Sequence, residues 1–383
     1  MKILFSVDNF DHGEGGAEKS TQTLSAMLAG AGHEATVLQT GEKRESYQRA
    51  GATVHFRHVG RPPVFHDREL RVLWQNHRWR PLLEGFLNDH PADLIFTQHR
   101  LSPATVAVAR RRGVPVVSFV RAYSMFCPSQ FRYHDALAEC ERRCFRCLPL
   151  RQKLKDPLVR AVVRMLRRAL EDSDLVVANS DYVRRVVERF CRARVRVLSP
   201  PVVLESVRVE REAGADRILF IKPQEVKGLS VFASVARAMP EQRFLVAGKL
   251  GTHARQRLAP LPNVECMGWV HDMREAYRRT RVLFGPSLWP EPFGRVFVEA
   301  AASGIPAVAS KTGGIPEAVG DGGLLVEDRG SVQAWLEAFA KLKDPALYDE
   351  LSRKARTHAE QFAPERLLPR LRGILKEELG LDA

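Results

Sequence analysis

Short apolar runs recur along the first half of the chain and alternate with segments of helical periodicity. A first run at Lys2–Val7 is followed by Ala35–Leu38, Val54–Phe56, Leu94–Thr97 and Val114–Val120. Runs of this length suit buried strands, and strands that alternate with helices are joined by crossover connections. The pattern therefore predicts a parallel sheet built of βαβ units, which is an α/β fold.

A second series of strands and helices begins at Arg217–Ile221, after the stiff linker Ser199–Pro201. The chain has 383 residues, of which 45% are hydrophobic, so more than one sizeable core is affordable. We expect one domain at residues 1–200 and a second at 201–363. A helical tail at residues 364–383 follows them.

Two carboxylates bracket a turn that opens a helix in the second domain. Glu291 is expected on a loop, and Glu299 lies roughly 9 Å along a helix that begins near Phe293. The acids are too far apart to share a proton, but they suit two ends of one extended ligand. Free amides of Phe293, Gly294 and Arg295 would favour an anionic or hydroxyl-rich partner. Two solvated acids flanking a turn would give the same spacing.

A glycine-rich loop follows the first strand and leads into a helix. Gly15 and Gly16 lie at the start of that helix, where backbone amides can approach a phosphate or a sugar nucleotide closely. His12 precedes them in the same loop. It either lines the mouth of this cradle or is an ordinary exposed histidine.

Three further candidates follow strands of the first sheet. Ligands of parallel sheets bind beyond the carboxyl ends of the strands, which places Gln98, His99 and Arg121 near the expected site on the acceptor or donor-sugar side. An arginine at position 121 can meet a carboxylate or a phosphate bidentately, or it can pack on its loop and reach solvent.

The segments Gly285–Gly294 and Ala301–Glu317 resemble those of the retaining glycosyltransferases of family 4. The resemblance rests on an E-x7-E element, Glu291 to Glu299, on the Gly-Gly-Ile-Pro-Glu turn that ends at Glu317, and on Gly15-Gly16-Ala17-Glu18. It implies a GT-B fold, in which two Rossmann-like doubly wound domains face a cleft. It also implies that the helix at the C-terminus crosses back to the first domain.

The resemblance implies a role for each matching residue in binding a nucleoside-diphosphate sugar. Glu299 would accept hydrogen bonds from the ribose hydroxyls, and Glu291 would face the donor sugar near its anomeric centre. Lys222 and Lys227 would stabilise the leaving diphosphate, although many relatives carry arginine at the first position.

Backbone groups complete the donor site that the resemblance implies. The segment that contains Gly268 and Val270 would meet the base, and amides of Gly15, Gly16, Phe293 and Gly294 would assist at the diphosphate. Trp269 would stack on the base or pack in the core. Relatives carry histidine where this chain has Arg121, so the catalytic role of that histidine does not transfer.

The expected activity is transfer of a sugar, with retention, from a UDP or GDP sugar to a hydroxyl acceptor that is lipid-linked or anionic. No metal is required, because two lysines can offset the charge of the leaving diphosphate. Family habit suggests synthesis of a bacterial surface glycan or glycolipid. Two alternatives stay open: a sugar-nucleotide epimerase or hydrolase on the same fold, and a non-catalytic sugar-nucleotide-binding scaffold.

Four cysteines form a cluster that would be an insertion of the first domain at residues 127–147, and they are Cys127, Cys140, Cys144 and Cys147. Their spacing suits a structural zinc site. Free thiols are the main alternative, and the iron–sulfur triad of radical-SAM enzymes is a weaker one because the cluster follows several strands of an open sheet. Cys191 and Cys266 read as core or near-core residues.

The formal net charge of +14 indicates an anionic partner. Nucleic acid fits poorly, since no aromatic residues interleave with the basic ones. No apolar run reaches the roughly 20 residues that span a bilayer, and no signal peptide precedes the first strand, so we expect a cytoplasmic protein. The basic stretch Arg151–Leu170 would either contact the inner face of the membrane or form a core helix with a solvated basic side.

Overall fold

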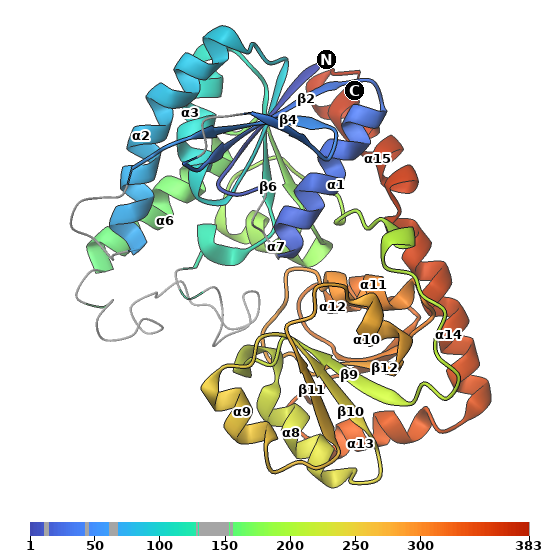
Figure 1. The fold of residues 1–383 in the computed structure, drawn as a ribbon. Coiled ribbons are helices and arrows are strands. Elements are labelled where there is room, and N and C mark those ends of the chain that lie inside the picture. The colour runs from blue at the N-terminus through green and yellow to red at the C-terminus, as the bar shows by residue number, and fades with distance from the viewer. Residues whose placement is uncertain are drawn as a thin grey trace. The chain divides into compact units, whose positions relative to one another are not determined.

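The computed structural model describes residues 1–10, 15–42, 46–60, 68–127, 129, 153 and 156–382. They form two compact units, one of residues Met1–Pro201 with Pro364–Ala383, the other of residues Val202–Ala363. We expected the domain boundaries after residues 200 and 363, and the two units divide after residues 201 and 363. Figure 1 shows the two units with their elements.

The first unit is built on a sheet whose described strands run in the order β3-β4-β2-β1-β5-β6-β7-β8. The strands are β1 (Lys2–Val7), β2 (Glu34–Thr40), β3 (Tyr47–Arg49), β4 (Ala52–Arg57), β5 (Leu94–Gln98), β6 (Val116–Val120), β7 (Leu175–Ala178) and β8 (Val195–Val197). All pairs are parallel except β3 with β4.

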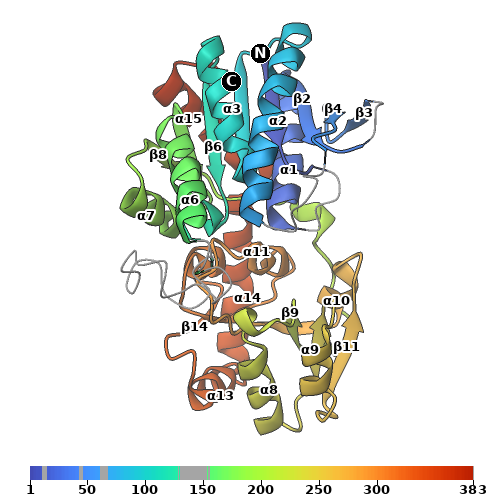
Figure 2. The ribbon, with the colours of Figure 1, turned by 90° about the vertical axis from the view of Figure 1, so that its left-hand side faces the viewer.

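Helices cover both faces of the first sheet. They are α1 (Gly16–Gly30), α2 (Arg68–Asp89), α3 (Ser102–Arg112), α6 (Asp156–Glu171), α7 (Asp181–Phe190) and α15 (Pro364–Leu379). Two short 3-10 helices follow strands, η1 (His99–Leu101) and η2 (Tyr123–Met125). Figure 2 looks onto α2, α3 and α6, which pack on one face, while α1 and α15 pack on the other.

Alternation along β1 explains the two layers of this unit. Ile3 and Phe5 pack with α1 and α15, whereas Leu4 packs with Trp79 of α2. Both sets of side chains are almost fully buried, as expected for a strand with helices on each side. Leu371 of α15 belongs to the same core as Ile3 and Phe5, which confirms that the C-terminal helix packs on the first domain.

The second unit carries a parallel sheet with the order β11-β10-β9-β12-β13-β14 among its described strands. These are β9 (Arg217–Ile221), β10 (Phe244–Ala247), β11 (Val264–Gly268), β12 (Thr280–Gly285), β13 (Ala307–Ser310) and β14 (Gly323–Val326). The order turns back at β9, which lies beside β12 and not only beside β10. Loops from β9 and β12 therefore leave the sheet next to each other.

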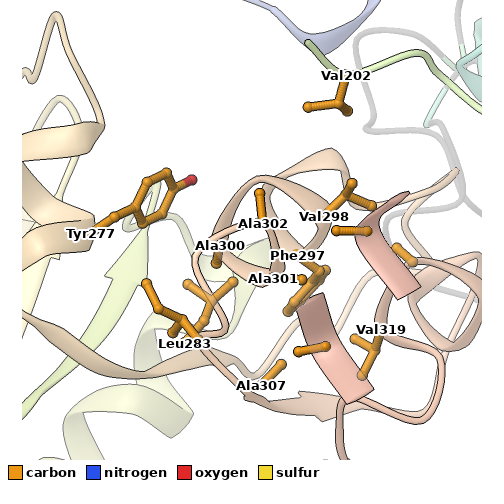
Figure 3. Close-up of a cluster of buried hydrophobic side chains, with 14 of the residues drawn as sticks. Val202, Tyr277, Leu283, Phe297, Val298, Ala300, Ala301, Ala302, Ala307 and Val319 are labelled. Carbon is orange, nitrogen blue, oxygen red and sulfur yellow. The ribbon is translucent and has the colours of Figure 1, made fainter. Parts of the chain in front are cut away.

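The helices of the second unit also form two layers. They are α8 (Leu229–Ala238), α9 (Thr252–Leu258), α10 (Arg274–Arg278), α11 (Arg295–Ala301), α12 (Ile315–Val319), α13 (Val332–Lys341) and α14 (Pro345–Ala359), with 3-10 turns η3 (Leu204–Ser206), η4 (Glu225–Lys227) and η5 (Glu360–Phe362). One core joins α8, α9 and α13 to one face of the sheet. The other, called the second core below, joins α10, α11 and α12 to the sheet. Figure 3 shows part of the second core.

Both units are thus α/β units with mostly parallel sheets, which confirms the predicted fold class. Among the described residues, no helix is long and apolar enough to cross a membrane.

Candidate functional site

Lys227 and Glu291 meet beyond the carboxyl ends of two neighbouring strands. Lys227 ends η4 after β9, and Glu291 lies on the loop after β12. The ammonium Nζ is 2.7 Å from Oε2 of the carboxylate, with the two side chains 19% and 12% exposed. The same Nζ lies 5.0 Å from the ring centroid of Trp289. Opposite charges this close and this sheltered attract each other more strongly than a surface pair does.

Backbone contacts between the two loops fix this ion pair. The carbonyl of Val226 accepts hydrogen bonds from the amides of Leu288 at 3.1 Å and Trp289 at 3.0 Å. Gly228 has φ +87°, and a Cβ built there would lie 1.8 Å from the carbonyl oxygen of Pro286. Only glycine fits a left-handed position with the opposite backbone so close. The separation of the two loops that carry Lys227 and Glu291 is therefore set by the main chain.

A third loop, which follows β13, closes against Glu291. The amide of Gly314 donates to the carbonyl oxygen of Glu291 at 2.7 Å. Gly313 has φ +61°, and a Cβ there would lie 2.3 Å from the same oxygen. Arg329 bridges the two loops, because its guanidinium donates to the carbonyl of Leu288 at 2.9 Å and to Oγ1 of Thr312 at 3.2 Å. The Gly-Gly-Ile-Pro-Glu turn thus supports the loop that carries Glu291.

Glu299 lies in α11 and is nearly buried. Its Oε1 accepts from Nε of Arg295 at 2.8 Å, and its Oε2 accepts from the Tyr277 hydroxyl at 3.3 Å. The helix begins at Arg295, after Gly294 in a left-handed conformation, so the expected start near Phe293 was wrong by two residues. The cause is the φ of +103° at Gly294, which a right-handed helix does not contain.

Lys222 has an unusual backbone. It follows β9 and takes φ +60°, a left-handed conformation that costs a non-glycine residue roughly 1–2 kcal/mol. Its amide donates to the carbonyl of Ala247 at 2.8 Å, which holds the turn against β10. Such strain concentrates at functional sites. Lys222 is exposed, whereas Lys227 is only partly so.

Gly268 and Val270 lie at the end of β11. The carbonyl of Gly268 accepts from the amide of Gly248 at 2.7 Å, and Val270 packs partly into the second core. Trp269 between them is half-buried, with Nζ of Lys249 4.6 Å from its ring centroid. Trp269 is therefore not a core residue, and one face of its indole already carries a cation.

In the first unit, Arg121 links the end of β6 to two other elements, α1 and β5. Its NH1 donates to Oε1 of Gln98 at 2.8 Å, to Oγ1 of Thr21 at 2.6 Å and to the carbonyl of Ala17 at 3.2 Å. Its guanidinium carbon lies 4.4 Å from the ring centroid of Phe119. Arg121 is half-buried, so the structure links it to the helix that begins at the glycine-rich loop and does not leave it on the surface.

The glycine-rich loop and the end of β5 supply the other candidates of this unit. Gly15 is the residue before α1, and Gly16 is its first residue. His99 follows Gln98 with φ +58°, a second strained non-glycine position. Burial is the main cause that lowers the pKa of His99, and the charge of Asp8 opposes this effect. The imidazole is therefore neutral near pH 7.

Sequence reasoning missed Asp8, which directly follows β1. Its Oδ2 accepts from Nε of Arg100 at 2.9 Å. Its Oδ1 is buried and has no hydrogen-bond partner among the described residues. Position after β1 was a usable signal, because it is the same signal that selected Gln98 after β5.

The remaining candidates fall largely outside the described residues. His12, Cys140, Cys144 and Cys147 lie there, so the geometry of the expected zinc site stays a prediction. Cys127 is buried, with Sγ 3.1 Å from Oγ of Ser129. In the part of the chain that the structure describes, no three His, Cys, Asp or Glu side chains are grouped to hold a metal. Cys266 is exposed, which corrects its expected near-core position.

Two family models match the chain, each over one part of it. The model described as Glycosyltransferase Family 4 matches residues 14–206, which is half of the chain. The model described as Glycosyl transferases group 1 matches residues 215–344. The chain belongs to glycosyltransferase family 4.

Relatives among curated proteins match over different lengths. A D-inositol 3-phosphate glycosyltransferase of Corynebacterium aurimucosum is 30% identical over 224 residues, which cover 55% of this chain and 50% of that protein. A relative from Klebsiella pneumoniae, named an uncharacterized 42.6 kDa protein in the cps region, is 23% identical over 337 residues, 82% of this chain and 86% of that protein. The chain thus spans about half of the first relative's length.

Solved structures share the fold of the whole chain. Sucrose-phosphate synthase from Thermosynechococcus elongatus superposes with a TM-score of 0.75 at 18% identity, covering 99% of each chain. Anabaena HepE, solved in complex with UDP-glucose, gives a TM-score of 0.73 at 18% identity and covers 98% of this chain and 100% of that one. These likenesses establish the GT-B fold.

Proposed function

We propose that this chain is a retaining, metal-independent glycosyltransferase that moves a sugar from a nucleoside-diphosphate sugar to a hydroxyl acceptor. The observation that carries the proposal is the pair Lys227–Glu291, 2.7 Å apart beyond β9 and β12. Open α/β sheets bind ligands at the point where the strand order reverses, and β9 beside β12 is that point. The pair places a cation and a carboxylate side by side there.

The cation suits a leaving diphosphate. Lys227 reaches the site from the main chain fixed by Gly228, and Lys222 lies on the same loop in its strained conformation. Two ammonium groups stabilise the charge that develops on a diphosphate as the sugar departs, without needing a metal ion. Donor binding replaces part of the Lys227–Glu291 attraction with contacts to phosphate oxygens.

The carboxylate suits the sugar. Released from Lys227, Glu291 lies where a donor hydroxyl or the positive charge that develops at the anomeric carbon would be stabilised. The acceptor would attack from the same face, and the leaving phosphate would take its proton. Glu299 would bind the ribose hydroxyls, and backbone groups of Gly268 and Val270 would meet the base. The amides of Phe293 and Gly294 would assist at the diphosphate.

Two of the relatives named above support the choice of donor and acceptor. Anabaena HepE is named with UDP-glucose, and the Corynebacterium protein is named for D-inositol 3-phosphate, a polyol that carries a phosphate. We extend the proposal to a UDP or GDP sugar and to an anionic or lipid-linked hydroxyl acceptor, in synthesis of a bacterial surface glycan or glycolipid. The net charge of +14 favours such acceptors.

The test is the thermal stability of the purified protein with UDP, GDP, ADP or TDP, each with and without a chelator. A nucleotide at a hundredfold excess over its Kd stabilises the folded state by about 2.7 kcal/mol, which raises Tm. We expect UDP or GDP to raise Tm and Lys227→Ala to abolish the rise. Lys354→Ala is the matched control, because Lys354 is an exposed lysine of α14 that pairs with Glu350.

Three results would count against the proposal. Absence of a shift with all four nucleotides would indicate another ligand. A shift that chelator removes would contradict metal-independent binding. Product analysis with the bound nucleotide's sugar separates transfer from epimerisation and hydrolysis, and inversion at the anomeric carbon would contradict retention.

A further inference from the structure

The carboxylate of Glu299 is held from two directions by two helices. Arg295, one turn earlier in α11, donates Nε–H to Oε1 at 2.8 Å. Tyr277 comes from α10 and donates its hydroxyl to Oε2 at 3.3 Å. Each oxygen therefore has one protein donor among the described residues. A carboxylate offers about four acceptor positions, so each oxygen retains one for a ligand.

Tyr277 cannot contact a ligand itself, because its side chain is completely buried. Figure 3 shows its ring beside the cluster of buried side chains, with the hydroxyl pointing toward the helix that carries Ala300. Leu283 of β12 lies in the same cluster. Packing on every side fixes the position of the hydroxyl, so Tyr277 can act only through Glu299.

The hydroxyl stays a donor over the whole working range of pH. Burial is the main cause that raises the pKa of Tyr277 well above its usual value, and the negative charge of Glu299 adds to it. Loss of the proton would place two anions in contact within a core. The direction of the bond is therefore fixed, from Tyr277 to Glu299.

We propose that Tyr277 is a positioning residue that orients Glu299 to accept hydrogen bonds from the vicinal hydroxyls of a ribonucleotide, and so makes the site prefer ribose to 2′-deoxyribose. The inference rests on the proposed function, because it needs a nucleotide in the second unit. With Arg295 on one oxygen and Tyr277 on the other, the plane of the carboxylate cannot rotate freely. Two neighbouring hydroxyls then find one acceptor position each.

The experiment measures Kd by calorimetry for UDP and for 2′-deoxy-UDP, or for GDP and 2′-deoxy-GDP if GDP stabilises the protein more. The wild-type protein should bind the ribonucleotide about tenfold more tightly, since a hydrogen bond to a charged group is of that order. Tyr277→Phe should reduce this preference to about threefold or less, because it weakens binding of the ribonucleotide alone. Binding of the 2′-deoxynucleotide should stay unchanged.

Tyr348→Phe is the matched control for loss of a buried tyrosine hydroxyl. Tyr348 lies in α14 of the same unit, is also buried, and donates its hydroxyl to the carbonyl of Arg281 at 2.9 Å. This variant should lower Tm and leave both Kd values and their ratio at wild-type levels. A general loss of stability therefore cannot imitate the loss of ribose preference.

The outcomes separate this inference from the proposed function. If no nucleoside diphosphate binds the wild-type protein, the proposed function falls and the inference falls with it. If the ribonucleotide binds but Tyr277→Phe keeps the full preference, the inference alone is overturned. Equal binding of ribo- and deoxyribonucleotide by the wild-type protein would overturn it as well.

Discussion

Glu291 pairs with Lys227 in the structure, and a donor sugar is its proposed second partner. In the structure it accepts from the ammonium of Lys227 and is largely sheltered from solvent. The ammonium offsets the charge of this carboxylate, so the negative charge would act fully on a sugar only when the lysine turns to another anion. The leaving diphosphate of a donor would be that anion. Donor binding would then draw Lys227 to the diphosphate and free Glu291 for the sugar in the same step.

Substitution of Glu291 by glutamine should separate binding from turnover. The amide keeps the size of the side chain, and its oxygen can still accept from Lys227, but it stabilises no positive charge. We expect the turnover number to fall by at least about a hundredfold, which is typical for a lost electrostatic contact in a transition state. Kd for UDP or GDP should change by less than about threefold, as calorimetry would measure. Unchanged turnover would refute the role given to Glu291.

At the scale of elements, the site depends on loops that touch through their backbones. The loops after β9, β12 and β13 approach each other through the carbonyls of Val226, Pro286 and Glu291. Side chains can adapt to a substitution, whereas a main-chain carbonyl at contact distance cannot move without moving its loop. The glycines of these loops are therefore as important to the site as its charges.

Substitution of Gly228 by alanine tests this dependence. Its φ of +87° costs alanine roughly 1–2 kcal/mol, and the contact of 1.8 Å with the carbonyl of Pro286 adds to that cost. We expect a fall in Tm of several degrees in a thermal melt and at least tenfold weaker binding of the diphosphate, because Lys227 moves with the loop. Gly251→Ala, at a glycine with open space around it, should change neither quantity.

Much of the element pattern could be predicted from sequence, because it depends on local periodicity. The helical tail expected at residues 364–383 is present as the helix Pro364–Leu379, and the strand at Lys2–Val7 is also as expected. The approach of Lys227 to Glu291 could not be predicted from residues alone. It depends on β12 pairing with β9, and that pairing joins segments about 60 residues apart. The contact of Tyr277 with Glu299 depends on helix packing in the same way.

The start of α11 shows the limit of local signals. Proline and glycine before Arg295 correctly indicated a turn, but the left-handed φ of Gly294 delays the helix by two residues. Sequence alone does not tell which φ a glycine adopts. The resemblance to a family located Glu291, Glu299 and the two lysines, and it could not indicate that Lys227 and Glu291 pair with each other.

At the scale of the whole molecule, positive charge is spread over exposed helices. The face of α6 that is turned to solvent carries Arg160, Arg164 and Arg168. Two of these have carboxylate partners, Asp156 for Arg160 and Asp172 for Arg168. A basic helix surface of this kind suits contact with anionic lipid, as the proposed lipid-linked acceptor would require.

Removal of this charge should weaken binding to anionic vesicles. The triple substitution of Arg160, Arg164 and Arg168 by glutamine removes about 1 kcal/mol of attraction per residue, or roughly a hundredfold in affinity. Co-sedimentation with vesicles containing anionic phospholipid would measure it, at low and high salt. The matched control changes Arg353, Lys354 and Arg356, exposed cations of α14, to glutamine. Equal loss of binding in both triple variants would contradict a specific role for α6.

The placement of α15 also bears on synthesis of the chain. Leu371 and Leu375 are completely buried in the core of the first unit, together with Ile3 and Phe5 from its first strand. A ribosome makes the N-terminus first, so that core lacks one wall until residues Pro364–Leu379 have been made. The second unit, by contrast, is continuous from Val202 to Ala363 and has all its residues earlier. The half of the protein that is made first is therefore the half that finishes folding last.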